Sequence, residues 1–229
     1  MSDTRSRGAR IATWVAVAMM LTGAVLLGLV GWQFWGTNWV AHREQGQATK
    51  ALTSRWEQGG TNLAPKYVPK GEASALIRVP RFGKSYVVPA FEGVATDVLA
   101  KGFGHFADSA DPGQVGNYAL AAHRVTHGEP LRRMPDLRPG DEVIVETVDV
   151  SYVYRIDTDP EKLIVPFTGV WVLEPLPQNP QAGGVQPAQR PGQRLITLTT
   201  CSEIFHTDDR MIAFGHLVRT AKKEGEKDE

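Results

Sequence analysis

Cysteine is nearly absent from this chain, because Cys201 is the only one among 229 residues. A single cysteine cannot form a disulfide within the chain, and it cannot supply the cysteine cluster of a structural zinc site. An excess of charge is also missing, since 25 Lys and Arg balance 25 Asp and Glu. This balance argues against a nucleic-acid partner, because proteins that bind nucleic acids carry a basic surface. Cys201 is therefore a buried packing residue, one half of an intermolecular disulfide or a reactive thiol.

Charged side chains are absent from one long stretch near the N-terminus, residues 11–35. At a rise of about 1.5 Å per residue, a helix of this length crosses the hydrocarbon core of a membrane, which is roughly 30 Å thick. Arginines precede the stretch and tryptophans lie near its far end, namely Arg5, Arg7, Arg10, Trp32, Trp35 and Trp39. This pattern predicts a single-pass anchor with a cytoplasmic N-terminus and an extracellular remainder. A cleaved signal peptide is the alternative, but its apolar region is usually only about 7 to 15 residues long.

Changes in composition divide the rest of the chain into a linker, a folded domain and two tails. Residues 36–75 are polar, with glycines and prolines, and are predicted to form a stalk or linker that contains a short helix. Residues 76–220 are predicted to form one folded domain, which leaves a cytoplasmic tail at 1–10 and a charged tail at 221–229.

The predicted domain contains short runs of β-branched and aromatic residues that are bounded by Gly, Pro and Asp. This pattern predicts an all-β barrel or sandwich with short helices. Strands are expected at 76–79, 85–88, 117–122, 142–148, 150–156, 162–165, 171–173, 194–201 and 211–218, helical turns near 94–102 and 130–134, and a long loop at 174–192.

Cys201 ends the predicted strand RLITLTTC, and Arg210 begins the next strand. A thiol at the end of a strand, beside a loop, is accessible, and an arginine at the start of the following strand can return to the same rim. Outside the cytoplasm, oxidation tends to consume free thiols. A free thiol is therefore unusual there unless the protein uses its reactivity. The expected extracellular location therefore favours a reactive thiol. The strand end by itself is more typical of an inert small apolar residue, and Arg210 by itself of an ordinary surface charge.

A reactive thiol needs a base, and the chain has 6 histidines. His42 belongs to the predicted stalk, His105 to a glycine-rich loop, and His216 to the interior of the last strand, where a structural role is expected. His123, His127 and His206 remain as candidates. Of these, His123 closes the apolar strand NYALAAH, so its position favours it as the partner of the thiol.

His123 and His127 have the spacing of a metal-binding pair on a helix. Gly128 and Pro130 follow directly and disfavour a helix at this point. We therefore expect no metal ion at this pair.

The three motifs together resemble the sortase family. Its hallmark is a TLxTC strand, here Thr197 to Cys201, followed by an arginine that begins the next strand, here Arg210, and preceded by a histidine that closes an apolar strand, here His123. The sequence around His123, GNYALAAHRVTHGEPLRRMPDLRPGD, is most similar to that of the class E sortases of actinobacteria.

This resemblance implies an eight-stranded β-barrel over residues 76–220 and a cysteine transpeptidase that needs no cofactor. Cys201 would be the nucleophile, His123 the acid and base, and Arg210 the oxyanion stabiliser. The expected substrates are proteins with a C-terminal sorting signal of the form Leu-Ala-x-Thr-Gly, cleaved between Thr and Gly. The expected acceptor is an amine of a peptidoglycan precursor or of a pilin.

Thr199 and Thr200 precede the nucleophile and are the candidate substrate-binding residues. Side chains alternate between the two faces of a strand, so Thr199 shares the face of Cys201 and Thr200 is more simply a packing residue. Two other functions stay open at this point: an inactive barrel that binds sorting signals or acts as a scaffold, and a redox sensor that works through Cys201.

Overall fold

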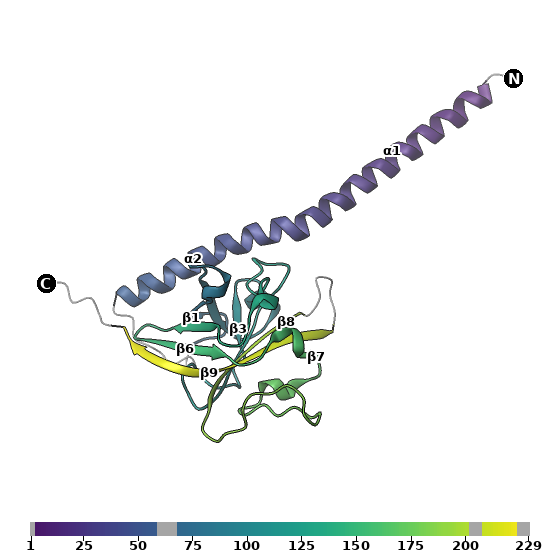
Figure 1. The fold of residues 1–229 in the computed structure, drawn as a ribbon. Coiled ribbons are helices and arrows are strands. Elements are labelled where there is room, and N and C mark those ends of the chain that lie inside the picture. The colour runs from purple at the N-terminus through teal and green to yellow at the C-terminus, as the bar shows by residue number, and fades with distance from the viewer. Residues whose placement is uncertain (1–2, 59–67, 202–207, 224–229) are drawn as a thin grey trace.

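The computed structural model describes residues 3–58, 68–201 and 208–223. It begins with helix α1 (Asp3–Gly31), which passes through the π-helical turn η1 (Trp32–Gly36) into helix α2 (Thr37–Glu57). The part of α1 from Gly8 to Gly31 is long and apolar enough to cross a membrane, and none of it is buried in the protein. Figure 1 shows α1 projecting away from the domain while α2 lies along it. The N-terminal helix is therefore a candidate membrane anchor.

The strands close into a barrel. Eight of the described strands follow each other in the order β6-β5-β1-β2-β3-β4-β8-β9, and pairing of β6 with β9 closes the ring. Their bounds are β1 Ala73–Arg78, β2 Val88–Glu92, β3 Phe103–His105, β4 Gly116–Ala121, β5 Glu142–Glu146, β6 Val150–Ile156, β8 Arg194–Cys201 and β9 Asp209–Lys222. The short strand β7 (Ile164–Pro166) pairs with the first part of β9. This closed barrel confirms the predicted eight-stranded all-β fold.

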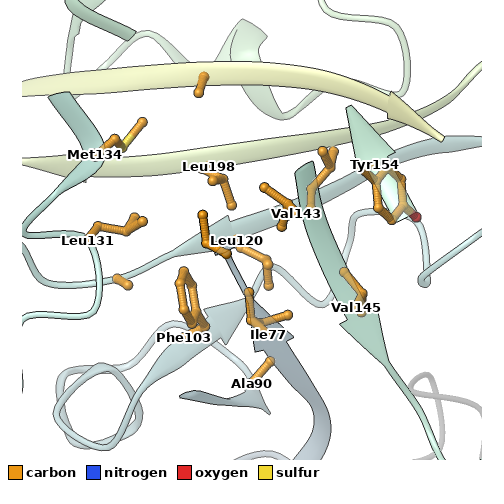
Figure 2. Packing of buried hydrophobic residues seen from close by; sticks show 14 of the residues in the cluster. Ile77, Ala90, Phe103, Leu120, Leu131, Met134, Val143, Val145, Tyr154 and Leu198 are labelled. Atoms are coloured by element: carbon orange, nitrogen blue, oxygen red, sulfur yellow. The ribbon is translucent and has the colours of Figure 1, made fainter. Parts of the chain in front are cut away.

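Side-chain alternation in the central strands separates the barrel interior from its outer face. Leu120 of β4 and Leu198 of β8 are fully buried in the main core, as Figure 2 shows. Burial of each such side chain stabilises the fold by about 1.5–3 kcal/mol. Side chains on the other face of the sheet, such as Ile212 and Phe214 of β9, belong to a second apolar cluster that includes Val172. The strands that end near Cys201 are thus buried on both faces.

The predicted strand at 171–173 is wrong, since these residues belong to the 3₁₀ helix η6 (Val170–Leu173). Strand β3 was not predicted, and of the predicted strand at 85–88 only Val88 belongs to a strand, as the first residue of β2. Apolar runs of three or four residues are too short for their periodicity to distinguish strand from helix. The remaining short helices are α3 (Thr96–Leu99), η3 (Pro80–Phe82), η4 (Met134–Asp136) and η5 (Pro160–Lys162). Residues 174–192 contain no helix or strand, in agreement with the predicted loop.

Helix α2 packs against the barrel. Ala41, Gln45 and Leu52 are its buried residues, and their spacing places them on one face of the helix. Near its end, the ring of Trp56 lies 4.5 Å from the ammonium group of Lys223, which follows β9. Part of the segment that was predicted as a stalk is therefore a helix docked on the folded domain.

Candidate active site

The three candidate catalytic residues come from the ends of neighbouring strands. In the parallel pair β4–β8, Ala121 is the register partner of Thr199. In the antiparallel pair β8–β9, Cys201 is the register partner of Arg210. His123 is two residues beyond Ala121, and Cys201 is two residues beyond Thr199. Two further residues in the same register would set the backbone of His123 beside that of Cys201.

Two hydrogen bonds tie these strands together next to the candidate residues. The hydroxyl of Thr200 donates to the carbonyl oxygen of Ala122 at 2.7 Å, and the amide of Ala122 donates to the carbonyl oxygen of Thr199 at 3.2 Å. Both threonines are buried, with exposed fractions of 3% for Thr200 and 8% for Thr199. The hydroxyl of Thr200 is therefore engaged within the protein, which agrees with its interpretation as a packing residue.

The imidazole of His123 lies against that of His127, with 4.7 Å between the ring centroids and 29° between the planes. Its Nε2 atom is shielded from solvent, and its carbonyl oxygen accepts a hydrogen bond of 3.0 Å from the amide of Leu131. The structure thus brings together two of the three candidate histidines. The third, His206, lies outside the described residues.

The turn that carries His127 has an unusual backbone. His127, Gly128 and Glu129 have φ values of 54°, 77° and 49°, all in the left-handed region. Glycine adopts this region freely, whereas a residue with a side chain pays about 1–2 kcal/mol for it. Contacts from the surrounding structure must hold such a turn.

The guanidinium group of Arg210 lies over the ring of Phe167, 5.5 Å from its centroid. Nη1 of Arg210 also donates to the carbonyl oxygen of Asp209 at 3.1 Å. Phe167 follows strand β7 and is 67% exposed. Its backbone is held by a hydrogen bond of 2.6 Å from its amide to the carbonyl oxygen of Asp208. Sequence reasoning missed Phe167 because β7 and β9 meet only in the folded barrel.

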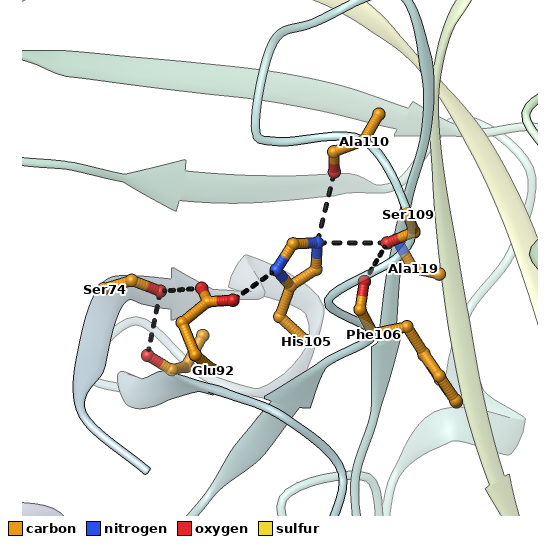
Figure 3. Close-up of polar contacts among 8 residues, drawn as sticks. Ser74, Glu92, His105, Phe106, Ser109, Ala110 and Ala119 are labelled. Atoms are coloured by element: carbon orange, nitrogen blue, oxygen red, sulfur yellow. Dashed lines mark hydrogen bonds and ion pairs between the residues drawn. The ribbon is translucent and has the colours of Figure 1, made fainter. Parts of the chain in front are cut away.

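His105 belongs to a buried polar cluster, shown in Figure 3. Its Nδ1 is 3.0 Å from a carboxylate oxygen of Glu92, and its Nε2 is 3.0 Å from the hydroxyl of Ser109. This order of side chains looks like that of a serine hydrolase triad. However, the hydroxyl of Ser109 donates to the carbonyl oxygen of Phe106 at 2.7 Å, so its proton is not directed at the imidazole. We interpret the cluster as a structural network that fixes β2 to β3.

The two remaining histidines have other surroundings. His42 lies on an exposed part of α2. Nδ1 of His216, in β9, is 2.8 Å from each carboxylate oxygen of Asp157. Among the residues that the structure describes, no three His, Cys, Asp or Glu side chains gather closely enough to hold a metal ion.

Comparison with known proteins agrees with the barrel fold. The sortase domain family matches residues 77–218. The chain belongs to the sortase family. Sortase SrtE1 from Streptomyces coelicolor is 37% identical over 226 residues, which cover 93% of this chain and 60% of that relative. The chain therefore spans less than two thirds of the length of this sortase.

Solved sortase structures share the fold. Sortase E from Streptomyces avermitilis superposes with a TM-score of 0.60 at 38% identity, over 70% of this chain and 97% of that one. Sortase E1 from Streptomyces coelicolor, solved with a tripeptide in its active site, gives a TM-score of 0.57 at 35% identity, over 66% of this chain and 91% of that one. These matches confirm the predicted family and its likeness to the class E sortases.

Proposed function

We propose that this sortase is a membrane-anchored cysteine transpeptidase in which Cys201, His123 and Arg210 carry the reaction. Its substrate is a protein with a C-terminal sorting signal of the Leu-Ala-x-Thr-Gly type, which it cleaves between Thr and Gly. The register of β4, β8 and β9 supports this proposal most strongly. It sets the backbone of Cys201 beside that of Arg210 and joins strand β8 to strand β4, which ends two residues before His123.

In the first half-reaction, the thiolate of Cys201 attacks the carbonyl carbon of the signal threonine. The developing oxyanion accepts hydrogen bonds from Arg210, whose guanidinium is permanently charged. The C–N bond to glycine then breaks, and His123 donates a proton to the leaving amine. The products are a thioester on Cys201 and a released C-terminal fragment that begins with glycine.

In the second half-reaction, an amine attacks the thioester carbonyl while His123 accepts its proton. The C–S bond breaks, an amide forms, and the thiolate of Cys201 is restored. A peptidoglycan precursor or a pilin provides this amine. Neither bond cleavage changes an oxidation state, so the reaction requires no redox cofactor.

Of the two threonines before the nucleophile, Thr199 is proposed to border the peptide groove because it shares the strand face of Cys201. Thr200 is proposed to act by packing, because its hydroxyl is bonded to Ala122. Phe167 adds an exposed apolar surface beside Arg210. A short peptide also occupies the active site of the solved sortase E1 from Streptomyces coelicolor. This observation supports peptide binding at the active site proposed here.

The anchor would place this chemistry at the outer surface of the cell membrane. Three exposed tryptophans in the π-helical turn η1 and at the start of α2, Trp32, Trp35 and Trp39, suit the membrane interface. The arginines before the apolar segment favour a cytoplasmic N-terminus. Both halves of the reaction would then take place outside the cell.

The test incubates the full-length chain in detergent with a labelled Leu-Ala-x-Thr-Gly peptide and an amine acceptor. Mass spectrometry should detect a thioester on Cys201 and the transpeptidation product. Cys201→Ala should form neither and should keep its fold, because the change removes little packing. If the wild-type chain binds the peptide but forms no adduct, it is a binding or scaffold barrel. If activity follows the oxidation state of Cys201 without peptide turnover, the redox function is correct.

A further inference from the structure

The turn that stacks His127 on His123 makes three described side-chain contacts with helix α2. The carbonyl oxygen of the Asn38 side chain accepts a hydrogen bond of 2.9 Å from the amide of Gly128. The amide group of the same side chain donates to a carboxylate oxygen of Glu129 at 2.7 Å. Gln45 adds a longer contact of 3.5 Å from its side-chain amide to the carbonyl oxygen of His127. One helix thus contacts all three left-handed residues.

Asn38 and Gln45 are seven residues apart, which is two helical turns, so they share one face of α2. Gln45 is 6% exposed, and Ala41 between them is 2% exposed. A β-carbon added to Gly128 would lie 2.5 Å from the Gln45 side chain, which shows how closely the turn approaches the helix. The turn and α2 are therefore packed together.

The barrel holds the neighbouring residues but not the turn itself in the contacts described. The hydroxyl of Tyr86 donates to the carbonyl oxygen of Pro130 at 2.7 Å, just after the turn. The amide of Leu131 bonds to the carbonyl oxygen of His123. These bonds fix the two ends of the segment. Inside it, the amide of Glu129 donates to the carbonyl oxygen of Thr126 at 3.1 Å, and the guanidinium of Arg132 contacts the Glu129 carboxylate. The described side-chain hydrogen bonds that reach residues 127–129 from outside the segment come from α2.

We propose that Asn38 is a positioning residue for His123. By holding the turn in its left-handed conformation, it keeps the ring of His127 stacked on the ring of His123. The orientation of the imidazole toward thiol and substrate then depends on α2. This inference rests on the proposed function, because it assigns the acid and base role to His123.

The same helix continues the candidate membrane anchor. Asn38 is seven residues beyond Gly31, where the apolar segment ends, so about 10 Å of helix separates the two. Only the π-helical turn η1 lies between α1 and α2. The segment that emerges from the membrane therefore also supports the active site. A truncated chain that begins after α2 would lose this support.

The test measures peptide cleavage by the full-length chain in detergent. Asn38→Ala should lower kcat between about 5-fold and 20-fold with little change in KM, since small displacements of a catalytic group cost rate. Its melting temperature should stay close to that of the wild type. Gln47→Ala is the matched control, because Gln47 is exposed on the same helix. It should behave as the wild type.

A rescue pair separates positioning from general destabilisation. Asn38→Asp keeps the acceptor for Gly128 but sets two carboxylates against each other at Glu129, so its kcat should fall. Adding Glu129→Gln restores a donor opposite the new carboxylate, and the double variant should recover most of the lost rate. Full activity of Asn38→Ala, or failure of the double variant to recover any rate, would overturn the inference.

Alkylation of Cys201 by iodoacetamide provides a measure that does not require turnover. Because Cys201 is the only cysteine, the reaction reports this thiol alone. The pH profile of its rate should differ between Asn38→Ala and the wild type if the His123 ring has moved. If the wild type cleaves no peptide, the proposed function fails, whereas unchanged profiles and unchanged turnover in Asn38→Ala reject only the role of Asn38.

Discussion

The hydroxyl of Thr200 donates a hydrogen bond to the carbonyl oxygen of Ala122, and these two residues directly precede Cys201 and His123. The bond joins the strands that carry the proposed nucleophile and its proposed base. Thr200→Val keeps the shape of the side chain but leaves the buried carbonyl without this donor, which costs about 1–3 kcal/mol. Urea denaturation should show that loss, and kcat should fall as well. Thr200→Ser, which keeps the hydroxyl, should stay near wild type in both measurements; equal losses in the two variants would contradict the role of the bond.

His123 and His127 should differ in their effect on rate. His123→Ala should lose about 10²- to 10⁴-fold in kcat, the usual contribution of general acid and base catalysis. His127→Ala should lose only about tenfold, because His127 acts by orienting the neighbouring ring. His127→Phe keeps a stacking surface and should recover part of that loss. The assignment of the base is wrong if His127→Ala proves more costly than His123→Ala in steady-state kinetics.

Arg210→Lys tests whether charge alone is sufficient at this position. Lysine keeps the charge but lacks the planar fork of donors. The variant should lose about 10²- to 10³-fold in kcat/KM, as expected for the loss of an oxyanion donor. Its melting temperature should hardly change, because lysine keeps the charge and the long side chain of this half-buried residue. Near-normal turnover with normal stability would mean that the forked donor is not used.

Phe167 should support Arg210 through the face of its ring. An exposed cation–π contact contributes about 0.5–1 kcal/mol, which corresponds to a loss of roughly two- to fivefold in kcat/KM for Phe167→Leu. Phe167→Tyr retains the aromatic face and is the control. Peptide kinetics that do not distinguish Leu from Tyr at this position would argue against the contact.

Asp141 gives a prediction about pH and stability. Burial tends to raise the pKa of its carboxyl group, but hydrogen bonds from the Arg81 side chain and the Arg138 amide outweigh burial, so the pKa lies below its ordinary value of 3.8. The carboxylate therefore stabilises the fold above the pKa of the unfolded state, and this contribution is lost as the pH falls through the folded pKa. Asp141→Asn should be less stable than wild type at pH 7, and the difference should shrink below about pH 4. A difference in urea midpoint that does not change with pH would contradict this cause.

Much of the barrel could be predicted because its central strands have strong local patterns. The strand predicted at 194–201 is β8 with the same bounds, since its β-branched and apolar residues suit burial on both faces. Strand β3 has only three residues, one of them Gly104, and carries no such pattern. It exists because neighbouring strands β2 and β4 provide its hydrogen bonds.

The contacts around the candidate site could not be predicted in the same way. Glu92 and His105 form a buried pair although nothing near either residue in the sequence marks the other as its partner. Phe167 and Arg210 meet only because β7 pairs with the first part of β9. Such pairs depend on how the barrel closes.

The sequence by itself determined the chemistry that is available to this protein: one thiol at a strand end, an arginine at the start of the next strand, a histidine after an apolar strand, and an apolar helix able to cross a membrane. These are local properties of composition and periodicity. Only the tertiary structure decided that Asn38 reaches Glu129, 91 residues away. Contacts between residues so far apart in the sequence are fixed by the packing of whole elements. Local preferences of the chain do not specify which distant residues meet when the loop between them closes.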